Sequence, residues 1–234
     1  LIYPETNTKA LDNLSFKIKA GEKVGIVGKV GSGKSSLLNL INRLYDVDEG
    51  NVLIGGSNIK DFKLDKLRSL IGNVMQNPFL FSESIKDNLL FGKIDATKEE
   101  IEKACKNAAI HKTINSFKNG YDTILGERGL TLSGGQIQRV SIARALIKNP
   151  QFFLFDDCLS AVDLDTENKI LKNIKVICEN KTTIMVSNRI SSIKDSDKIF
   201  VLENGKIIET GNHKTLMENK NYYSHLFNRQ QNEK

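Results

Sequence analysis

Residues 28–35 read Gly28-Lys29-Val30-Gly31-Ser32-Gly33-Lys34-Ser35, and this stretch decides the fold. It fits the pattern Gly-x-x-x-x-Gly-Lys-Ser/Thr, in which the glycines let backbone N–H groups turn inward around phosphate. The run before it, EKVGIVG at 22–28, is typical of a buried parallel strand, and the apolar spacing at 34–44 predicts a helix after it. A glycine-rich turn alone would not require Lys34 and Ser35 in this register. We therefore expect a loop, from Gly28 through Ser36, that binds the phosphates of a nucleotide.

Two groups in and near this loop have specific expected roles. The Lys34 ammonium supplies a mobile charge to the outer phosphates, and the Ser35 hydroxyl is a ligand for Mg²⁺. A predicted strand at 152–155 ends in Asp156-Asp157. Because parallel strands present their carboxyl ends to the ligand crevice, we expect Asp156 to be the second partner of the magnesium ion.

A second turn of small residues, Leu132-Ser133-Gly134-Gly135-Gln136, leads directly into a predicted helix. Its N–H groups, the Ser133 hydroxyl and the helix dipole also favour an anion. One nucleotide already has its helix N-terminus at Lys34, far away in the sequence. We therefore expect this second turn to serve a nucleotide held by another molecule.

Strand and helix patterns alternate through the rest of the chain. Apolar alternation at Leu14, Phe16 and Ile18 predicts a strand, and Asn204-Gly205 predicts a hairpin between strands at 198–202 and 206–209. Other strands are expected at 52–54, 152–155 and 182–186, and helices at 99–109, 137–147, 164–178 and 213–227. We expect one α/β domain over 1–234 with a P-loop ATPase core and a mostly parallel sheet. The ATPase core, together with an antiparallel β subdomain, would occupy residues 1–76 and 150–234. A helical lobe would be inserted between them at residues 77–149.

Composition narrows the class of protein. The 234 residues are 39% hydrophobic and 26% charged, which is ordinary for a soluble protein with a sizeable core. The net charge of +6 comes from scattered lysines, which favours solvated faces over a nucleic-acid surface. Three cysteines without a Cys-x-x-Cys pair fit reduced thiols in a cytosolic compartment. Because the chain starts at Leu1 and has neither a signal peptide nor a long apolar run, we interpret it as a piece of a longer protein.

With Leu-Ser-Gly-Gly-Gln between the phosphate loop and the Asp156 strand, nearly the whole chain resembles the ATP-binding cassette of ABC transporters. In that family this segment closes on the ATP of a partner cassette. The resemblance implies ATP and Mg²⁺ as cofactors. It also implies a second cassette as partner, identical or not, and a transmembrane domain at the cytoplasmic face of the cell membrane.

The same resemblance assigns roles to further residues. Tyr3 would stack on adenine, although as a surface aromatic it would be unremarkable by itself. Gln76 would sense magnesium and the transmembrane domain, and residues 160–163 resemble the D-loop. The stretch Gly-Glu-Arg-Gly at 126–129, and the lack of Glu-Pro after Asp156, resemble exporters more than importers.

The sequence departs from the family pattern at the chemical step. Asp157 stands where the family has the glutamate base, and Asn188 stands where it has a histidine for the γ-phosphate. Aspartate is one methylene shorter, and asparagine carries no charge and shuttles no proton. We expect weak hydrolysis at the chain's own site, as in the degenerate half of heterodimeric bacterial exporters, with Ser133, Gly135 and Gln136 completing the partner's site. Alternatively, Asp157 acts through a water and Asn188 suffices.

Other interpretations stay open. A non-transport ABC ATPase acting on nucleic acid or the ribosome is disfavoured, because no long coiled coil fits between Lys34 and Ser133 and only one cassette is present. A regulatory module that binds ATP without hydrolysis also fits the two departures. The apolar run at 79–81 either packs within the lobe or docks a transmembrane domain. The aromatic residues Tyr222, Tyr223 and Phe227 are interpreted as packing.

Overall fold

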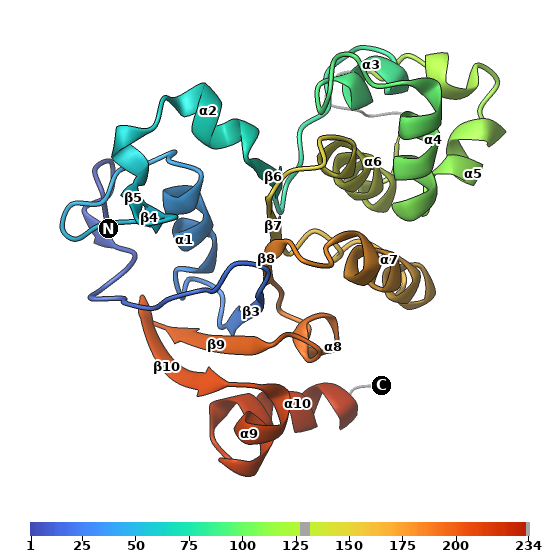
Figure 1. Ribbon diagram of the computed structural model, residues 1–234. Coiled ribbons are helices and arrows are strands. Elements are labelled where there is room, and N and C mark those ends of the chain that lie inside the picture. Colours follow the sequence, from blue (N-terminus) through green and yellow to red (C-terminus); the bar gives the residue numbers. More distant parts are fainter. Residues whose placement is uncertain (127–131, 233–234) are drawn as a thin grey trace. The chain divides into compact units, whose positions relative to one another are not determined.

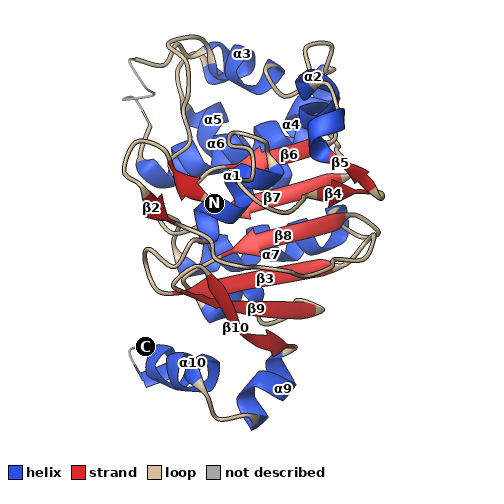
Figure 2. Cartoon of the chain, turned by 90° about the vertical axis from the view of Figure 1, so that its left-hand side faces the viewer, coloured by secondary structure: helices blue, strands red, loops and turns tan. Residues whose placement is uncertain are grey.

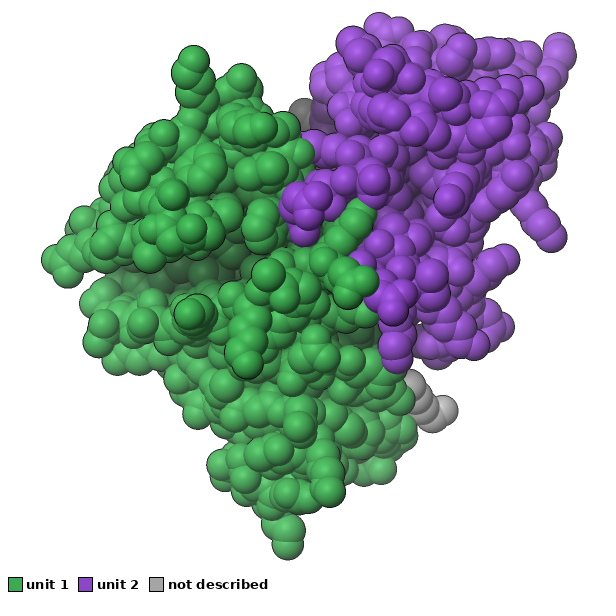
Figure 3. Space-filling view, viewed as in Figure 1, with its two compact units in different colours: residues 1–71, 152–156, 180–234 green, residues 72–151, 157–179 purple. Residues whose placement is uncertain are grey.

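The structure is a computed structural model that describes residues 1–126 and 132–232. The chain divides into two compact units, shown in different colours in Figure 3. Unit 1 comprises residues 1–71, 152–156 and 180–234, and unit 2 comprises residues 72–151 and 157–179. Each unit is described by itself below.

A six-stranded sheet organises the fold, and Figure 2 shows its strands in the order β10-β9-β3-β8-β7-β6. Strand β3 pairs in parallel with β8 and β9, β7 pairs in parallel with β8, and β10 pairs with β9 in the antiparallel sense. The strands are β3 (Lys23–Gly28), β6 (Ile71–Val74), β7 (Phe152–Asp156), β8 (Thr182–Val186), β9 (Lys198–Glu203) and β10 (Lys206–Gly211). The expected α/β fold with a mostly parallel sheet is confirmed.

Small elements complete unit 1. Two antiparallel pairs are β1 (Ile2–Tyr3) with β2 (Thr8–Lys9), and β4 (Leu53–Ile54) with β5 (Ser57–Asn58). The helices are α1 (Lys34–Ile41), α2 (Leu64–Ser69), α8 (Ile190–Ile193), α9 (His213–Glu218), α10 (Tyr222–Asn232) and a 3₁₀ turn at Ile59–Asp61. Figure 1 places α9 and α10 beyond β10, at the C-terminal end of the chain.

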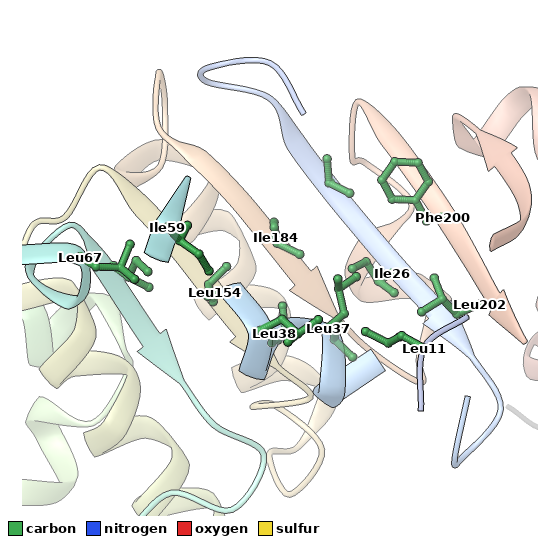
Figure 4. Close-up of a cluster of buried hydrophobic side chains, with 14 residues drawn as sticks. Leu11, Ile26, Leu37, Leu38, Ile59, Leu67, Leu154, Ile184, Phe200 and Leu202 are labelled. Atoms are coloured by element: carbon green, nitrogen blue, oxygen red, sulfur yellow. The ribbon is translucent and has the colours of Figure 1, made fainter. Parts of the chain in front are cut away.

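The core of unit 1 lies between α1 and the parallel strands. Ile26, Leu154 and Ile184 come from three strands, and Leu37 and Leu38 come from α1 (Figure 4). All are at most 5% exposed. Such burial explains why these strands are continuous apolar runs rather than alternating ones, and it holds the start of α1 against the carboxyl ends of the strands.

Helices dominate unit 2. They are α3 (Ile85–Leu90), α4 (Lys98–Asn107), α5 (His111–Ser116), α6 (Gly134–Ile147) and α7 (Leu164–Ile177), with a 3₁₀ turn at Gly120–Asp122. Helix α6 packs against α3 and α4. In the described part of the chain, no helix has both the length and the apolar character to cross a bilayer. All three cysteines are buried.

The structure corrects several local predictions. No strand forms around Leu14, Phe16 and Ile18, although these three side chains pack against the core. In this segment the Lys17 carbonyl accepts a hydrogen bond from the Lys198 ammonium group at 3.2 Å. The first helix ends at Ile41, because the Asn42 side chain bonds the Leu38 carbonyl and Arg43 has a φ of 49°.

The C-terminal region also differs from its prediction. A single helix was expected over 213–227, and the structure has α9 and α10, separated where Lys220 adopts a φ of 53°. Strand β6 was not predicted, since its four residues IGNV show neither alternation nor a continuous apolar run. The hairpin at Asn204-Gly205 is confirmed, with both residues at positive φ.

Candidate nucleotide-binding site

The loop between β3 and α1 has the geometry of a phosphate cradle. A Cβ on Gly28 would lie 2.1 Å from the Leu202 carbonyl oxygen, and a Cβ on Gly33 would lie 2.5 Å from that of Ala10. Gly31 and Gly33 have φ values of 80° and 99°, which L side chains rarely adopt. The loop can therefore leave the strand and begin the helix only with glycine at these positions.

Polar groups around this loop fit an anion. Gly33 occupies the N-cap of α1 and offers no capping side chain, so the helix N-terminus is open to an external acceptor. The Ser32 hydroxyl is buried without a hydrogen-bond partner. A buried hydroxyl of this kind is costly unless a ligand satisfies it. Val30 is 92% exposed, so it can contribute only its backbone.

Lys34 lies over the loop rather than in solvent. Its Nζ donates to the carbonyls of Gly28 and Lys29, each at 2.8 Å, and the residue is 8% exposed. The Lys29 side chain points to the hairpin instead, where it forms an ion pair with Glu203 at 2.9 Å. Of the two lysines, Lys34 is therefore the one whose ammonium group is held within the cradle.

Unit 1 also contains two of the residues expected for magnesium, Ser35 and Asp156, and the one expected for adenine, Tyr3. Helix α1 packs against β7, so Ser35 at the start of the helix and Asp156 at the end of the strand belong to contacting elements. The described residues contain no cluster of three or more His, Cys, Asp or Glu that could enclose a metal ion. Ser35 and Asp156 offer oxygen donors, which Mg²⁺ prefers together with waters and phosphate ligands. The Tyr3 hydroxyl donates to Ser36 Oγ at 2.8 Å, while its ring meets Tyr45 edge-on.

Asn188 follows β8 in the same unit. The segment 187–190 is fixed from two sides: the Ser187 N–H donates to the Ile26 carbonyl at 3.1 Å, and Gln230 of α10 donates to the Asn188 carbonyl at 2.7 Å. Unit 1 thus gathers the phosphate loop, Asp156, Asn188 and Tyr3. Gln76, Asp157 and the turn at 133–136 belong to unit 2.

The turn at 133–136 begins the long helix α6. Ser133 and Gln136 form a capping box, in which Ser133 Oγ accepts from the Gln136 N–H at 3.3 Å and Gln136 Oε1 accepts from the Ser133 N–H at 2.9 Å. Ser133 and Gly134 are exposed. Of the residues expected to meet a second nucleotide, Ser133 and Gln136 thus hold each other, and Ser133 and Gly134 face solvent.

The backbone of residues 160–161 lies against this helix. A Cβ on Gly135 would be 2.6 Å from the Ala161 carbonyl oxygen. Gln138 is 5% exposed; its Nε2 donates to Ser160 Oγ at 3.1 Å and its Oε1 accepts from the Ala161 N–H at 3.0 Å. The sequence analysis missed Gln138, although a polar residue on the buried face of a predicted helix is a detectable signal. It ties the expected D-loop to the helix that carries Ser133.

Three other expected residues lie in unit 2. Asp163 is the N-cap of α7, where its carboxylate accepts a hydrogen bond from the Thr166 N–H. This hydrogen bond holds the pKa of the Asp163 carboxyl below its usual value. Asp157 is 9% exposed and has a φ of 41°, a left-handed conformation that aspartate tolerates better than most residues. Gln76 is exposed in the loop after β6. Of the stretch 126–129, residues 127–129 lie outside the described residues.

Replacement of Gly135 by alanine tests the close approach of α6 to residue 161. Because its Cβ would meet a backbone oxygen, we expect Gly135→Ala to lower the free energy of unfolding by about 1–3 kcal/mol. The matched control is Gly134→Ala, whose Cβ would meet only the Ala161 methyl at 3.7 Å and should be tolerated. Urea denaturation of both variants is the measurement. Equal stability of the two variants would contradict the close packing.

Comparisons with known proteins agree with this geometry. Residues 11–160 match the ABC transporter family. A multidrug export ATP-binding/permease protein of Bacillus subtilis, YgaD, is 47% identical over 225 residues, which are 96% of this chain and 39% of that protein. Similarly named proteins of Staphylococcus aureus are 45% identical over the same share. The chain thus spans about two fifths of the length of these curated relatives.

A solved structure is also similar. The structure of a bacterial Atm1-family ABC exporter with ATP bound matches with a TM-score of 0.95 and 41% identity, over 98% of this chain and 40% of that one. The family match covers more than half of the residues and includes the phosphate loop, the turn at 133–136 and Asp156. On this basis the chain belongs to the ABC transporter family, and it carries the ATPase domain of that family.

Proposed function

We propose that this chain binds and hydrolyses ATP with Mg²⁺ and thereby powers export by a transporter at the cytoplasmic face of the membrane. The observation that carries the proposal is the cradle at 28–36: glycines that admit no Cβ, the unpartnered Ser32 hydroxyl, and Lys34 held over the loop. The relatives named for ATP-binding and export support it. We also propose that residues 1–234 form one cassette, with 77–149 as its helical lobe.

In this proposal each group of site residues has its own role in binding the nucleotide and the magnesium ion. The backbone of 28–36 surrounds the phosphates, Lys34 turns its ammonium group from the loop carbonyls toward the outer phosphates, and Tyr3 contacts the base. Ser35, Asp156 and Gln76 would hold Mg²⁺, which neutralises phosphate charge when bound. Ser133, Gly134, Gly135 and Gln136 would complete the site of a second cassette. Closure of the dimer on ATP would be reversed when phosphate is lost.

The first test is ATP affinity. Substitution of Lys34 by alanine removes the charged donor, so we expect Mg-ATP to bind at least about tenfold more weakly than to the wild type, as a lost hydrogen bond to a charged group implies. The matched control is Lys66→Ala on exposed α2. Titration calorimetry on the complete protein that contains this chain measures both. Absence of Mg-ATP binding by the folded wild type would reject the proposed function.

We further propose that the chain's own site hydrolyses ATP slowly. Asp157 stands at the position of the expected base, and its carboxylate is one methylene, roughly 1.5 Å, shorter than that of glutamate. A general base must approach its proton donor to about 2.6–3.2 Å, or act through one water. The left-handed backbone at Asp157 further fixes where the short side chain can reach. Asn188 adds a second departure, because an amide carries no charge.

The change Asp157→Glu tests this second proposal. If the short carboxylate limits turnover, the glutamate should raise the single-turnover rate by about a hundredfold or more, because a positioned general base typically contributes about 10²–10⁴-fold. The same substitution at exposed Asp165, which lies on the surface of α7, is the matched control and should change nothing. Rapid-quench assays with excess protein over ATP provide the rate. A wild type as fast as its Asp157→Glu variant would show that the short carboxylate does not limit turnover, and a wild type as fast as an ordinary cassette would exclude a weak site. A variant without turnover would favour a regulatory module.

A surface of unit 2 is proposed to dock the transmembrane domain. Three aromatic side chains, Phe79, Phe81 and Phe91, are 47%, 40% and 60% exposed and contact one another in a row. Phe79 meets Phe81 edge-on with ring centroids 5.0 Å apart, and Phe81 stacks on Phe91 with ring centroids 4.4 Å apart. Arg144 of α6 donates to the Phe79 carbonyl at 2.7 Å and fixes the loop. The row lies just after Gln76 in the sequence. Clustered exposed rings of this kind mark an interaction surface, and a membrane-domain loop is the partner that the export proposal requires.

Labelling of engineered cysteines tests this docking surface. In the complete protein, we expect Phe91→Cys to react with maleimide at least about tenfold more slowly than Ile94→Cys, because reactivity follows solvent access. Ile94 is 89% exposed and lies outside the aromatic row. The native cysteines give little background, since they are buried and burial raises the pKa of Cys105 to about 11. Equal labelling of the two engineered positions would contradict docking at the row.

A further inference from the structure

The C-terminal helix α10 makes a two-sided contact with the segment 187–190. Gln230 Nε2 donates to the Asn188 carbonyl at 2.7 Å, and Gln230 Oε1 accepts from the Ile190 N–H at 3.0 Å. The two partners are one acceptor and one donor, so only one orientation of the carboxamide fits. A single side chain 40 residues away in sequence thus holds the backbone on both sides of Arg189.

This contact lies at the start of helix α8. Ile190 is the first residue of α8, and Arg189 at its N-cap supplies no capping hydrogen bond. Gln230 therefore takes the place of the missing cap, satisfying the first N–H of α8. The Arg189 N–H donates to Ser187 Oγ at 3.0 Å, which tightens the same turn. Gln230 thus contacts the backbone on either side of Arg189.

Helix α10 is itself firmly attached to unit 1. Tyr223 is fully buried, its hydroxyl is 2.8 Å from His213 Nδ1, and its N–H donates to Glu209 at 3.1 Å. At the first residue of the helix, the Tyr222 ring lies 5.5 Å from Lys29 Nζ, in the phosphate loop. The helix therefore contacts the phosphate loop at Tyr222 and the segment 187–190 at Gln230, about two helical turns later.

We propose that Gln230 is a positioning residue for the nucleotide site: it fixes the backbone of 187–190 so that the Asn188 side chain meets the terminal phosphate of ATP. This inference rests on the proposed function. It assigns α10 a role beyond the packing that its aromatic residues suggest. Because the two Gln230 hydrogen bonds hold the loop after β8 and not the phosphate cradle, they should influence the rate of turnover rather than the affinity for ATP.

The variant Gln230→Met keeps length and volume and removes both hydrogen bonds. The matched control is Gln231→Met, since Gln231 is an exposed neighbour on the same helix. In the complete protein, we expect Gln230→Met to lower the single-turnover rate about three- to thirtyfold, as the loss of two ordinary hydrogen bonds implies. The ATP dissociation constant should stay within about twofold of the wild type, because the cradle is intact.

Gln230→Glu gives a readout that a merely structural role would not produce. An ionised carboxylate only accepts, so it repels the Asn188 carbonyl; a protonated carboxyl donates there and still accepts from Ile190. The rate of Gln230→Glu relative to the wild type should therefore rise as pH falls toward the carboxyl pKa. A flat ratio between pH 8 and about 5, just above the ordinary pKa of Glu, would overturn the proposal.

Amide hydrogen exchange separates this inference from the proposed function. The Ile190 N–H should exchange about tenfold faster in Gln230→Met than in Gln231→Met, since one hydrogen bond is lost. Unchanged exchange, or faster exchange with an unchanged rate of hydrolysis, would overturn the positioning role. Absence of ATP binding by the wild type would reject the proposed function instead. The exchange rates would then still show whether Gln230 protects the Ile190 N–H.

Discussion

The close approach of β3 to the backbone of β9 at Gly28 is the constraint on which the rest of the site depends. No Cβ fits there, because the Leu202 carbonyl oxygen would be 2.1 Å away. With glycine at this point the chain can turn tightly out of the sheet, take up positive φ at Gly31 and Gly33, and begin α1 with its N-terminus uncapped. The same geometry that closes the turn leaves N–H groups and the Ser32 hydroxyl to an anion.

Parallel pairing extends this constraint to the other site residues of unit 1. Strands β3, β7 and β8 run in the same direction, so Gly28, Asp156 and Ser187 end at the same edge of the sheet. Each strand is held there by apolar side chains that pack under α1 (Figure 4). The positions of the strand ends are therefore well defined, because the core beneath them is close-packed. Loops of different sequence can follow the same strands. Asp157 and Asn188 illustrate such variation at the point where the chemistry would occur.

Two glutamines, the buried Gln138 and the half-buried Gln230, show how loops are fixed without regular structure. Gln138 bonds residues 160 and 161, and Gln230 bonds residues 188 and 190, and each uses both ends of its carboxamide. A carboxamide can satisfy one backbone donor and one acceptor together, which no charged side chain can do. In both cases the loop contacted follows a strand of the sheet. These contacts connect α6 and α10 to loops that the family resemblance associates with nucleotide.

The sequence by itself determined what depends on neighbours along the chain. The phosphate loop, the buried strands β3, β7 and β8, the hairpin at Asn204-Gly205 and the helix after the turn at 132–136 follow from residue type and spacing, because backbone sterics and periodicity act over a few residues. The departures at Asp157 and Asn188 follow from the family resemblance. Only the tertiary structure decided that Leu14 to Ile18 form no strand, that β6 joins the sheet, that Lys34 folds over the loop, and that Gln138 and Gln230 hold distant turns. Apart from the Lys34 contacts, which span 6 and 5 residues, those outcomes depend on groups that meet across 22 to 181 residues of sequence, and no local pattern records such a contact.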